Sequence, residues 1–413
     1  MTVKITTLDN GLRIVAEQRL NLETASIGVW VNVGARNEDK TVNGITHCLE
    51  HMFFKGTENR SARDIAFEIE AVGGHLNAYT TRDNTTYYAR VLKDDVPLAV
   101  DLLSDILLNS TFDEQELERE KDVILQELGQ AIDTPDDIVF DHLQAAAFSE
   151  QALGRSILGT TDTIRSFRSD ILRQYMRENY ITSNMVVSVV GNFDHDALIE
   201  LVARKFENAP TGVSKQAVSA KYTGGRITEA RTLEQIHLTL GWKGCAFEHD
   251  DYYPMQIYST VLGGGMSSRL FQEIREKRGL AYSVYSFTGS HKETGIFGIY
   301  AGTSPELASQ VIPVIKNEMA MIADNFSEDE IKIAAAQLKA GLMMALESTT
   351  SRMEQLGRQV LLFDRIISTE EMISNVEAVS LKSVKAIATS LANSDNISLA
   401  AVGDEQVQSL KAA

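Results

Sequence analysis

The segment FDEQEL at residues 112–117 returns later in the chain as FSEDEI at residues 326–331. An amphipathic helical pattern precedes each copy, at Val96–Leu108 and at Glu306–Ala323, and a second helical pattern follows each copy. A segment that recurs with the same neighbours on both sides indicates a duplicated structural unit.

Each half of the chain also closes in the same way. A helical pattern leads into a short apolar strand that ends in Val-Gly, at Asn184–Gly191 and again at Asn396–Gly403. The strands recur at nearly the same spacing as the helical segments, which favours duplication over coincidence. Between the halves, residues 207–225 contain Pro210, several glycines and small polar residues, a composition typical of a linker.

We therefore predict a first domain over residues 1–208, a linker over 209–221 and a second domain over 222–413. Runs of strand-forming residues come early in each half, and long helices follow them. The expected strands are Ser26–Val33, Tyr87–Leu92, His237–Trp242 and Gly295–Gly302. The fold class expected from this order is α+β, with two similar domains, each a mostly antiparallel sheet with helices packed on one face.

The composition narrows the classes of function. The 413 residues are 44% hydrophobic and 23% charged, as in globular proteins, and the formal net charge of −18 argues against a nucleic-acid partner. The charge fits either simple solubility or an acidic cleft that collects basic peptides. No apolar run is long enough to span a membrane, no leader is apparent, and two cysteines, Cys48 and Cys245, indicate a reducing compartment. We expect a cytoplasmic protein.

The most specific motif is GITHCLEHM at residues 44–52. On a helix, His47, Glu50 and His51 share one face, because positions i, i+3 and i+4 are neighbours there. Two imidazoles one turn apart can clamp a divalent metal, and the carboxylate beside them can take a proton from water. The motif therefore predicts a metal-dependent hydrolase.

A catalytic zinc site needs a third protein ligand and one open position. Glu116, Glu118, Glu120 and Glu127 all lie in the helical segment 113–130, and the spacing of seven residues places the last two on one face. For either of these two glutamates taken alone, a solvated helix face is the more common explanation. The residues themselves leave the choice open.

The H-x-x-E-H motif followed by this pair of glutamates resembles the inverzincin peptidases of the pitrilysin and insulysin family. Within the family, the chain looks most similar to the β subunit of mitochondrial processing peptidase and its short bacterial relatives. The resemblance implies one Zn²⁺ per chain, bound by His47, His51 and Glu127. It also implies that Glu50 is the general base and that Glu120 supports the ligands or handles protons.

The resemblance extends to residues that would bind a peptide. The segment GGHLNAYT at 73–80 resembles the family's edge strand, in which Asn77 and Ala78 would hold substrate backbone by strand addition. Phe54 matches an aromatic residue of the pocket after the cleaved bond, although core packing explains it equally well. Asp137 and Asp141 match acidic residues that receive a basic side chain upstream of the cut, or they simply mark a helix N-terminus.

In the second half, residues 275–282 resemble the family's Arg-x6-Tyr signature, which places Arg275 and Tyr282 at the carbonyl oxygen of the cleaved bond. The glycine run at 263–265 lacks the G-K-S/T of a phosphate loop and fits a turn. The repeat aligns Glu127 with Gly341, so the second half is expected to bind no metal.

Together these features predict a zinc-dependent endopeptidase or oligopeptidase that cleaves unfolded or presequence-like basic peptides inside a dimer chamber. Because Arg275 and Tyr282 match residues that lie far from the zinc domain in long relatives, we expect a homodimer with sites completed in trans. A heterodimer with a diverged paralogue is the alternative. A non-catalytic assembly subunit is disfavoured by the intact metal motif, and a small-molecule hydrolase is disfavoured by the edge strand. We expect no nucleic-acid or membrane partner.

Overall fold

A computed structural model describes residues 3–215 and 217–411 and divides the chain into two compact units. Unit 1 runs to Leu128 and continues over Ser156–Val218 and Met343–Ile367. Unit 2 comprises Gly129–Arg155, Ser219–Leu342 and the chain from Ser368 onward. Each unit therefore takes its main part from one half of the sequence and a short segment from the other half.

Unit 1 is built on a six-stranded sheet with the strand order β1-β2-β6-β3-β5-β4. Its strands are β1 (Val3–Thr7), β2 (Arg13–Gln18), β3 (Thr24–Val31), β4 (His75–Thr80), β5 (Thr85–Leu92) and β6 (Met185–Gly191). All neighbouring pairs are antiparallel except β2 and β6, which run parallel. The strand β4 lies at one edge, next to β5, so its outer side is not paired within this sheet.

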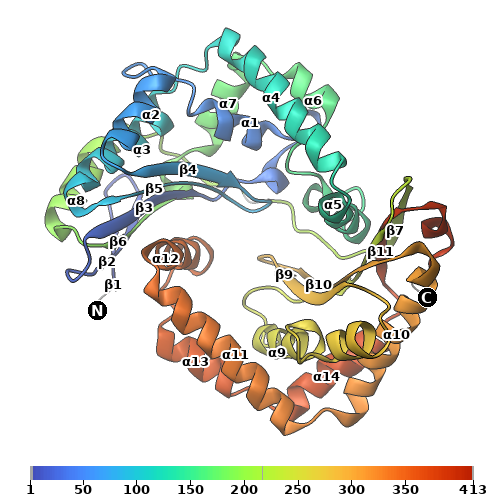
Figure 1. Ribbon diagram of the computed structural model, residues 1–413. Coiled ribbons are helices and arrows are strands. Elements are labelled where there is room, and N and C mark those ends of the chain that lie inside the picture. The colour runs from blue at the N-terminus through green and yellow to red at the C-terminus, as the bar shows by residue number, and fades with distance from the viewer. Residues whose placement is uncertain (1–2, 216, 412–413) are drawn as a thin grey trace. The chain divides into compact units, whose positions relative to one another are not determined.

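Helices cover one face of this sheet (Figure 1). They are α1 (Ile45–Met52), α2 (Ala62–Ala71), α3 (Val96–Asn109), α4 (Glu114–Ile132), α6 (Thr161–Ser166), α7 (Ser169–Asn179) and α8 (His195–Lys205). Side chains alternate across the strands, so Ile27 and Val29 of β3 point into the core beneath these helices, while Trp30 points to the opposite face. The expected fold class, α+β with a mostly antiparallel sheet, is confirmed.

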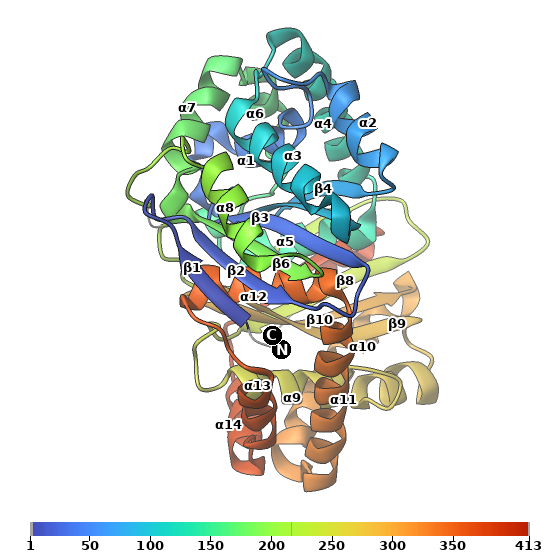
Figure 2. The same cartoon turned by 90° about the vertical axis from the view of Figure 1, so that its left-hand side faces the viewer.

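The opposite face is covered by α12 (Thr349–Phe363), a helix from the second half of the sequence (Figure 2). Met353 and Leu356 of this helix pack on the buried ring of Trp30. A buried ion pair joins the helix to the sheet, with 2.7 Å between Arg352 Nε and Glu17 Oε2. The helix is therefore part of the core of unit 1.

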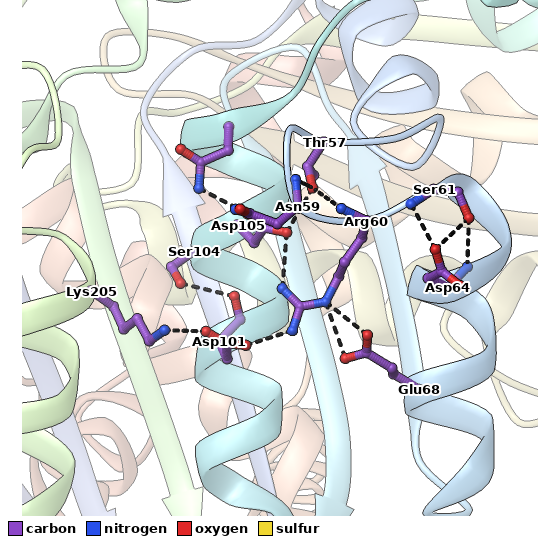
Figure 3. A network of polar contacts seen from close by, with 11 residues as sticks. Thr57, Asn59, Arg60, Ser61, Asp64, Glu68, Asp101, Ser104, Asp105 and Lys205 are labelled. Atoms are coloured by element: carbon purple, nitrogen blue, oxygen red, sulfur yellow. Dashed lines mark hydrogen bonds and ion pairs between the residues drawn. The ribbon is translucent and has the colours of Figure 1, made fainter.

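A polar network holds the segment after α1 against α2 and α3 (Figure 3). The guanidinium of Arg60 lies 3.0 Å from Glu68 Oε2, 2.6 Å from Asp101 Oδ2 and 2.9 Å from Asp105 Oδ2. Lys205 at the end of α8 also binds Asp101. One arginine thus fixes where the chain runs as it leaves α1, and it joins this segment to two neighbouring helices.

Unit 2 contains a five-stranded sheet with the order β7-β11-β8-β10-β9. Its strands are β7 (Gly225–Ala230), β8 (Ile236–Lys243), β9 (Ser283–Ser290), β10 (Gly295–Thr303) and β11 (Ser398–Gly403). Its helices are α5 (Pro135–Ala147), α9 (Tyr252–Gly263), α10 (Pro305–Asn325), α11 (Glu328–Glu347), α13 (Thr369–Glu377) and α14 (Leu381–Ala392), with a π-helical turn at Phe271–Lys277.

The two sheets confirm the duplication. When β2, β6, β3, β5 and β4 are matched with β7, β11, β8, β10 and β9, the strand orders are identical, and the single parallel pair falls at the same place. The matching helices are α3 with α10, α4 with α11, and α5 with α12. In this last pair, each helix packs on the sheet of the other half of the sequence, α5 on β8 and β11 and α12 on β3 and β6.

Candidate metal centre

The helix α1 has one apolar face and one face that carries the side chains of the H-x-x-E-H motif. Its apolar side chains recur at helical spacing and are buried in the core of unit 1: Ile45, Cys48, Leu49 and Met52. His47, Glu50 and His51 lie on the other face and remain partly accessible. Core packing therefore fixes the rotation of the helix and with it the direction of the H-x-x-E-H side chains.

The N-terminus of α1 is capped from a distance. Gly44 at the N-cap offers no side-chain acceptor, and Glu38 replaces it. The carboxylate of Glu38 accepts hydrogen bonds from the backbone N–H groups of Gly44 (2.7 Å) and Thr46 (2.9 Å). Burial raises the pKa of this carboxyl, although these hydrogen bonds oppose the shift. Glu38 thus holds the first turn of the motif helix in place.

The helix α4 brings Glu127 to the two histidines. Glu127 Oε2 lies 3.3 Å from His51 Nε2 and 3.7 Å from His47 Nε2. These three side chains form the one group of potential metal ligands found within residues 3–215 and 217–411. Ligand atoms at about 2.0–2.1 Å from a tetrahedral zinc ion lie about 3.3 Å apart, so the spacing fits one ion.

Glu120 lies behind the histidines. Its Oε2 is 3.0 Å from His51 Nδ1, and its Oε1 is 2.5 Å from Lys55 Nζ. Because Nδ1 bonds the carboxylate, the lone pair of His51 Nε2 is left for a metal. Burial favours the protonated form of Glu120, but His51 and Lys55 outweigh burial and lower its pKa. Glu120 is placed as a support of a ligand rather than as a ligand.

The charges around the histidines also favour a cation. Burial, followed by the neighbouring His51, lowers the pKa of His47 to about 4, so its imidazole is neutral and can donate a lone pair. Burial opposes the charged form of His51, yet the carboxylates of Glu120, Glu127 and Glu50 raise its pKa. This pocket attracts positive charge, and two imidazole nitrogens with a carboxylate oxygen are a donor set that suits zinc.

Glu50 lies beside the ligand group but is not part of it. Its Oε2 accepts a hydrogen bond from Thr80 Oγ1, at the end of β4. Burial raises the pKa of Glu50, and the hydrogen bond from Thr80 acts in the opposite direction. A carboxylate with a raised pKa beside a metal pocket is suited to accept a proton. Cys48, by contrast, is buried on the apolar face, where burial raises its pKa to about 12.

The expected peptide-binding residues of unit 1 lie near α1. Asn77 and Ala78 belong to β4, and this strand packs beside α1 at the edge of the sheet. Asn77 is exposed, and its Oδ1 accepts a hydrogen bond of 2.8 Å from the N–H of Ala78. Phe54 is half-buried against the core of unit 1, which agrees with core packing, the alternative explanation of this residue. Its place in a substrate pocket stays a prediction.

Unit 2 contains the remaining predicted site residues. Arg275, on the π-helical turn, stacks with its Cζ 4.8 Å from the ring centre of Tyr282, and Tyr282 is 73% exposed. The two residues therefore form a preassembled pair. Asp137, which is exposed, and Asp141, which is half-buried, lie on α5 in the same unit. The roles of all four residues stay predictions.

The structure also identifies residues that the sequence had not singled out. Glu38, Lys55 and Thr80 touch the motif helix, the supporting carboxylate and the expected base, respectively. Thr80 closes the edge-strand segment, so its place in that motif was a usable signal. Nothing in the residue pattern marks Glu38 or Lys55, because their partners are defined only by the fold.

Comparison with known families gives two adjacent matches. Residues 13–161 match the model of insulinase (peptidase family M16), and residues 166–338 match the peptidase M16 inactive domain. The first match contains the metal-ligand group, and the second contains Arg275 and Tyr282. No helix within residues 3–215 and 217–411 has both the length and the apolar character that a bilayer crossing requires.

Individual proteins match over nearly the whole chain. An uncharacterized zinc protease of Bacillus subtilis is 40% identical over 95% of this chain and 96% of its own length. A second uncharacterized zinc protease, from Streptomyces coelicolor, is 40% identical over 94% of this chain and 86% of its own. A Pseudomonas fluorescens crystal structure, described as a peptidase M16 inactive domain, shares the fold with a TM-score of 0.90 at 20% identity and 98% coverage of both chains. The chain thus belongs to the insulinase family of peptidases, family M16.

Proposed function

We propose that this protein is a zinc-dependent endopeptidase or oligopeptidase that hydrolyses extended, unfolded peptides. The observation that carries the proposal is the convergence of His47, His51 and Glu127, with Glu50 beside them and Glu120 behind His51. This arrangement offers three potential ligands, a candidate base and a candidate support of a ligand, which supports metal-assisted hydrolysis. The printed names of the relatives, zinc proteases, support the choice of Zn²⁺ as cofactor.

His47, His51 and Glu127 would hold the Zn²⁺, which would supply Lewis-acid chemistry to the attacking water and to the carbonyl of the cleaved bond. Glu50 accepts the proton of that water on its carboxylate and later returns it to the leaving amine. The raised pKa of Glu50 makes it a stronger base, which helps the carboxyl to hold the proton between the two transfers.

A substrate in this reaction would lie along β4 as an additional strand. The edge position of β4 and the exposure of Asn77 support this, because an edge strand presents backbone groups that a peptide can pair with. Arg275 and Tyr282 would donate hydrogen bonds to the developing oxyanion. Asp137 and Asp141 would favour peptides with a basic residue upstream of the cut.

We further propose that two copies of the chain assemble into a chamber and complete each other's sites. The zinc ligands and the Arg275–Tyr282 pair lie in different units of the chain, and each set is already formed within its unit. Two-fold symmetry would produce two equivalent sites.

The test of the function is zinc content combined with cleavage of a quenched peptide library. Wild type should hold one zinc per chain and cleave, and the library should reveal any upstream basic preference. Glu50→Gln should keep its zinc and lose turnover by about a hundredfold or more, the scale of general-base catalysis. Zinc-loaded wild type that cleaves no peptide would instead support a non-catalytic assembly subunit.

A further inference from the structure

Thr80 contacts the carboxylate of Glu50 directly. Its hydroxyl donates a hydrogen bond to Glu50 Oε2. Thr80 is the last residue of β4, whereas Glu50 lies in the second turn of α1. The end of an edge strand is therefore hydrogen-bonded to the side chain that we assign as the base.

The strand explains why this residue meets Glu50. Side chains alternate along β4, so Leu76, Ala78 and Thr80 share one face. Leu76 and Ala78 pack against the core of unit 1 on that face, next to α1. Valine has the shape of threonine and suits a strand equally well, so packing alone does not require a hydroxyl at this position. What distinguishes the position is the carboxylate opposite it.

The backbone of β4 points to the same connection. The N–H of Thr81 donates to the carbonyl of Asn84 across the hairpin to β5, at 2.8 Å. In an antiparallel pair, alternate residues turn their backbone groups away from the partner strand, so Ala78 and Thr80 turn theirs toward the free edge. That edge is where the proposed function places the peptide. One strand would thus bind the peptide backbone and hold the base.

We propose that Thr80 is a positioning residue, which acts through Glu50. Its hydroxyl holds Oε2, so that Oε1 faces the attacking water next to a peptide that lies on β4. The inference rests on the proposed function. A glutamate has several rotatable bonds, and a catalytic group displaced by about 1 Å can lose a hundredfold in rate. Holding the Glu50 carboxylate in place should therefore raise the rate of the reaction step and change the affinity for the peptide little.

The kinetic test compares variants at this position. Thr80→Val should keep one zinc per chain and the affinity for an uncleaved peptide, with KM unchanged and kcat lower by about ten- to a hundredfold. Thr80→Ser, which restores the donor, should return near wild type. In a Glu50→Gln background, Thr80→Val should cause no further loss, because the two residues act as one unit.

A spectroscopic test needs no turnover. In zinc-free protein labelled with ¹³C-carboxyl glutamate, the Glu50 resonance is the one that disappears in Glu50→Gln. Loss of a hydrogen bond should move this resonance in Thr80→Val, and Thr80→Ser should restore it. If zinc-loaded wild type cleaves no peptide, the proposed function fails, while this resonance still decides whether Thr80 holds Glu50.

The matched control is Thr239→Val on β8. Thr239 is a buried strand threonine of unit 2 whose hydroxyl makes only long contacts, at 3.5 Å. This variant should turn over like wild type. Wild-type kcat in Thr80→Val would overturn the inference, as would an unmoved resonance or a serine variant as slow as the valine one. If Thr80→Val fails to fold, Thr80→Ala allows the same comparison.

Discussion

His51 and Glu120 show how single contacts assign roles within the metal centre. Glu127 faces the Nε2 atoms of both histidines, whereas Glu120 contacts only His51 Nδ1 and is also bound by Lys55. A carboxylate that pairs with a lysine and bonds the imidazole nitrogen facing away from the metal site orients that imidazole as a ligand. The two glutamates, equivalent by sequence spacing, are thus distinguished by which nitrogen each one meets.

This difference predicts opposite results for two similar changes. Glu127→Gln should strip the zinc, because an amide is a poor zinc ligand, and His47→Ala and His51→Ala should do the same. Glu120→Gln should keep the zinc but weaken its affinity by about ten- to a hundredfold, as the loss of a support to a ligand does. Elemental analysis after dialysis against a graded chelator measures both. Zinc retained in Glu127→Gln but lost in Glu120→Gln would reverse the two assignments.

At the level of single residues, the sequence predicted what lies on one helix face. The convergence of His47, Glu50 and His51 follows from helical spacing, and the seven-residue spacing indicated that Glu120 and Glu127 share a face. Thr80, Lys55 and Glu38 could not be found in that way. Their contacts depend on how β4, the segment after α1 and the segment before it fold back, which no local periodicity encodes.

Among the elements, α12 offers the sharpest test of packing. Gly357 lies where this helix crosses Trp30, and a Cβ atom added there would come within 2.5 Å of the indole ring. Gly341 on α11 is also within a helix, but a Cβ atom added there would meet nothing within 4 Å. The two glycines therefore differ only in what lies beside them.

We expect Gly357→Ala to lower the free energy of unfolding by about 1–3 kcal/mol, because it overpacks a well-filled core. Gly341→Ala should raise it by up to about 1 kcal/mol, because alanine favours the helix and the space is open. Urea titration followed by circular dichroism measures both changes. Equal effects at the two positions would mean that α12 does not pack on Trp30 as described.

At the scale of elements, the strands and helices were predictable because their hydrophobic periods are clear. The expected strand at 295–302, for example, is found as Gly295–Thr303. The covering of the second face of each sheet was not predictable. An amphipathic pattern shows that α5 and α12 bury one side, but it does not say which sheet receives that side.

For the whole molecule, the central prediction concerns completion of the active site in trans. Glu50→Gln and the double variant Arg275→Ala/Tyr282→Phe should each be inactive alone. After subunit exchange, about half of the dimers contain one chain of each kind, and each of these has one intact site, so activity should approach about a quarter of wild type.

Exchange is verified by co-purification of differently tagged chains, and the quenched peptide reports activity. Exchange without recovered activity would mean that Arg275 and Tyr282 act within their own chain or take no part. An absence of self-association would instead favour a diverged paralogue as the partner, and mixing with candidate paralogues would then test that alternative.

The exchange of α5 and α12 has a consequence for synthesis. A ribosome releases the chain from its N-terminus, so the sheet of unit 1 emerges long before residues 343–367, which cover its second face. During that interval Trp30, Val186 and Val190 face solvent, and the nascent chain carries an uncovered apolar surface. Because of this delay, folding of the zinc-binding half cannot finish before residues 343–367 have been synthesised, and a cut at the linker would deprive each half of the helix that covers the second face of its sheet.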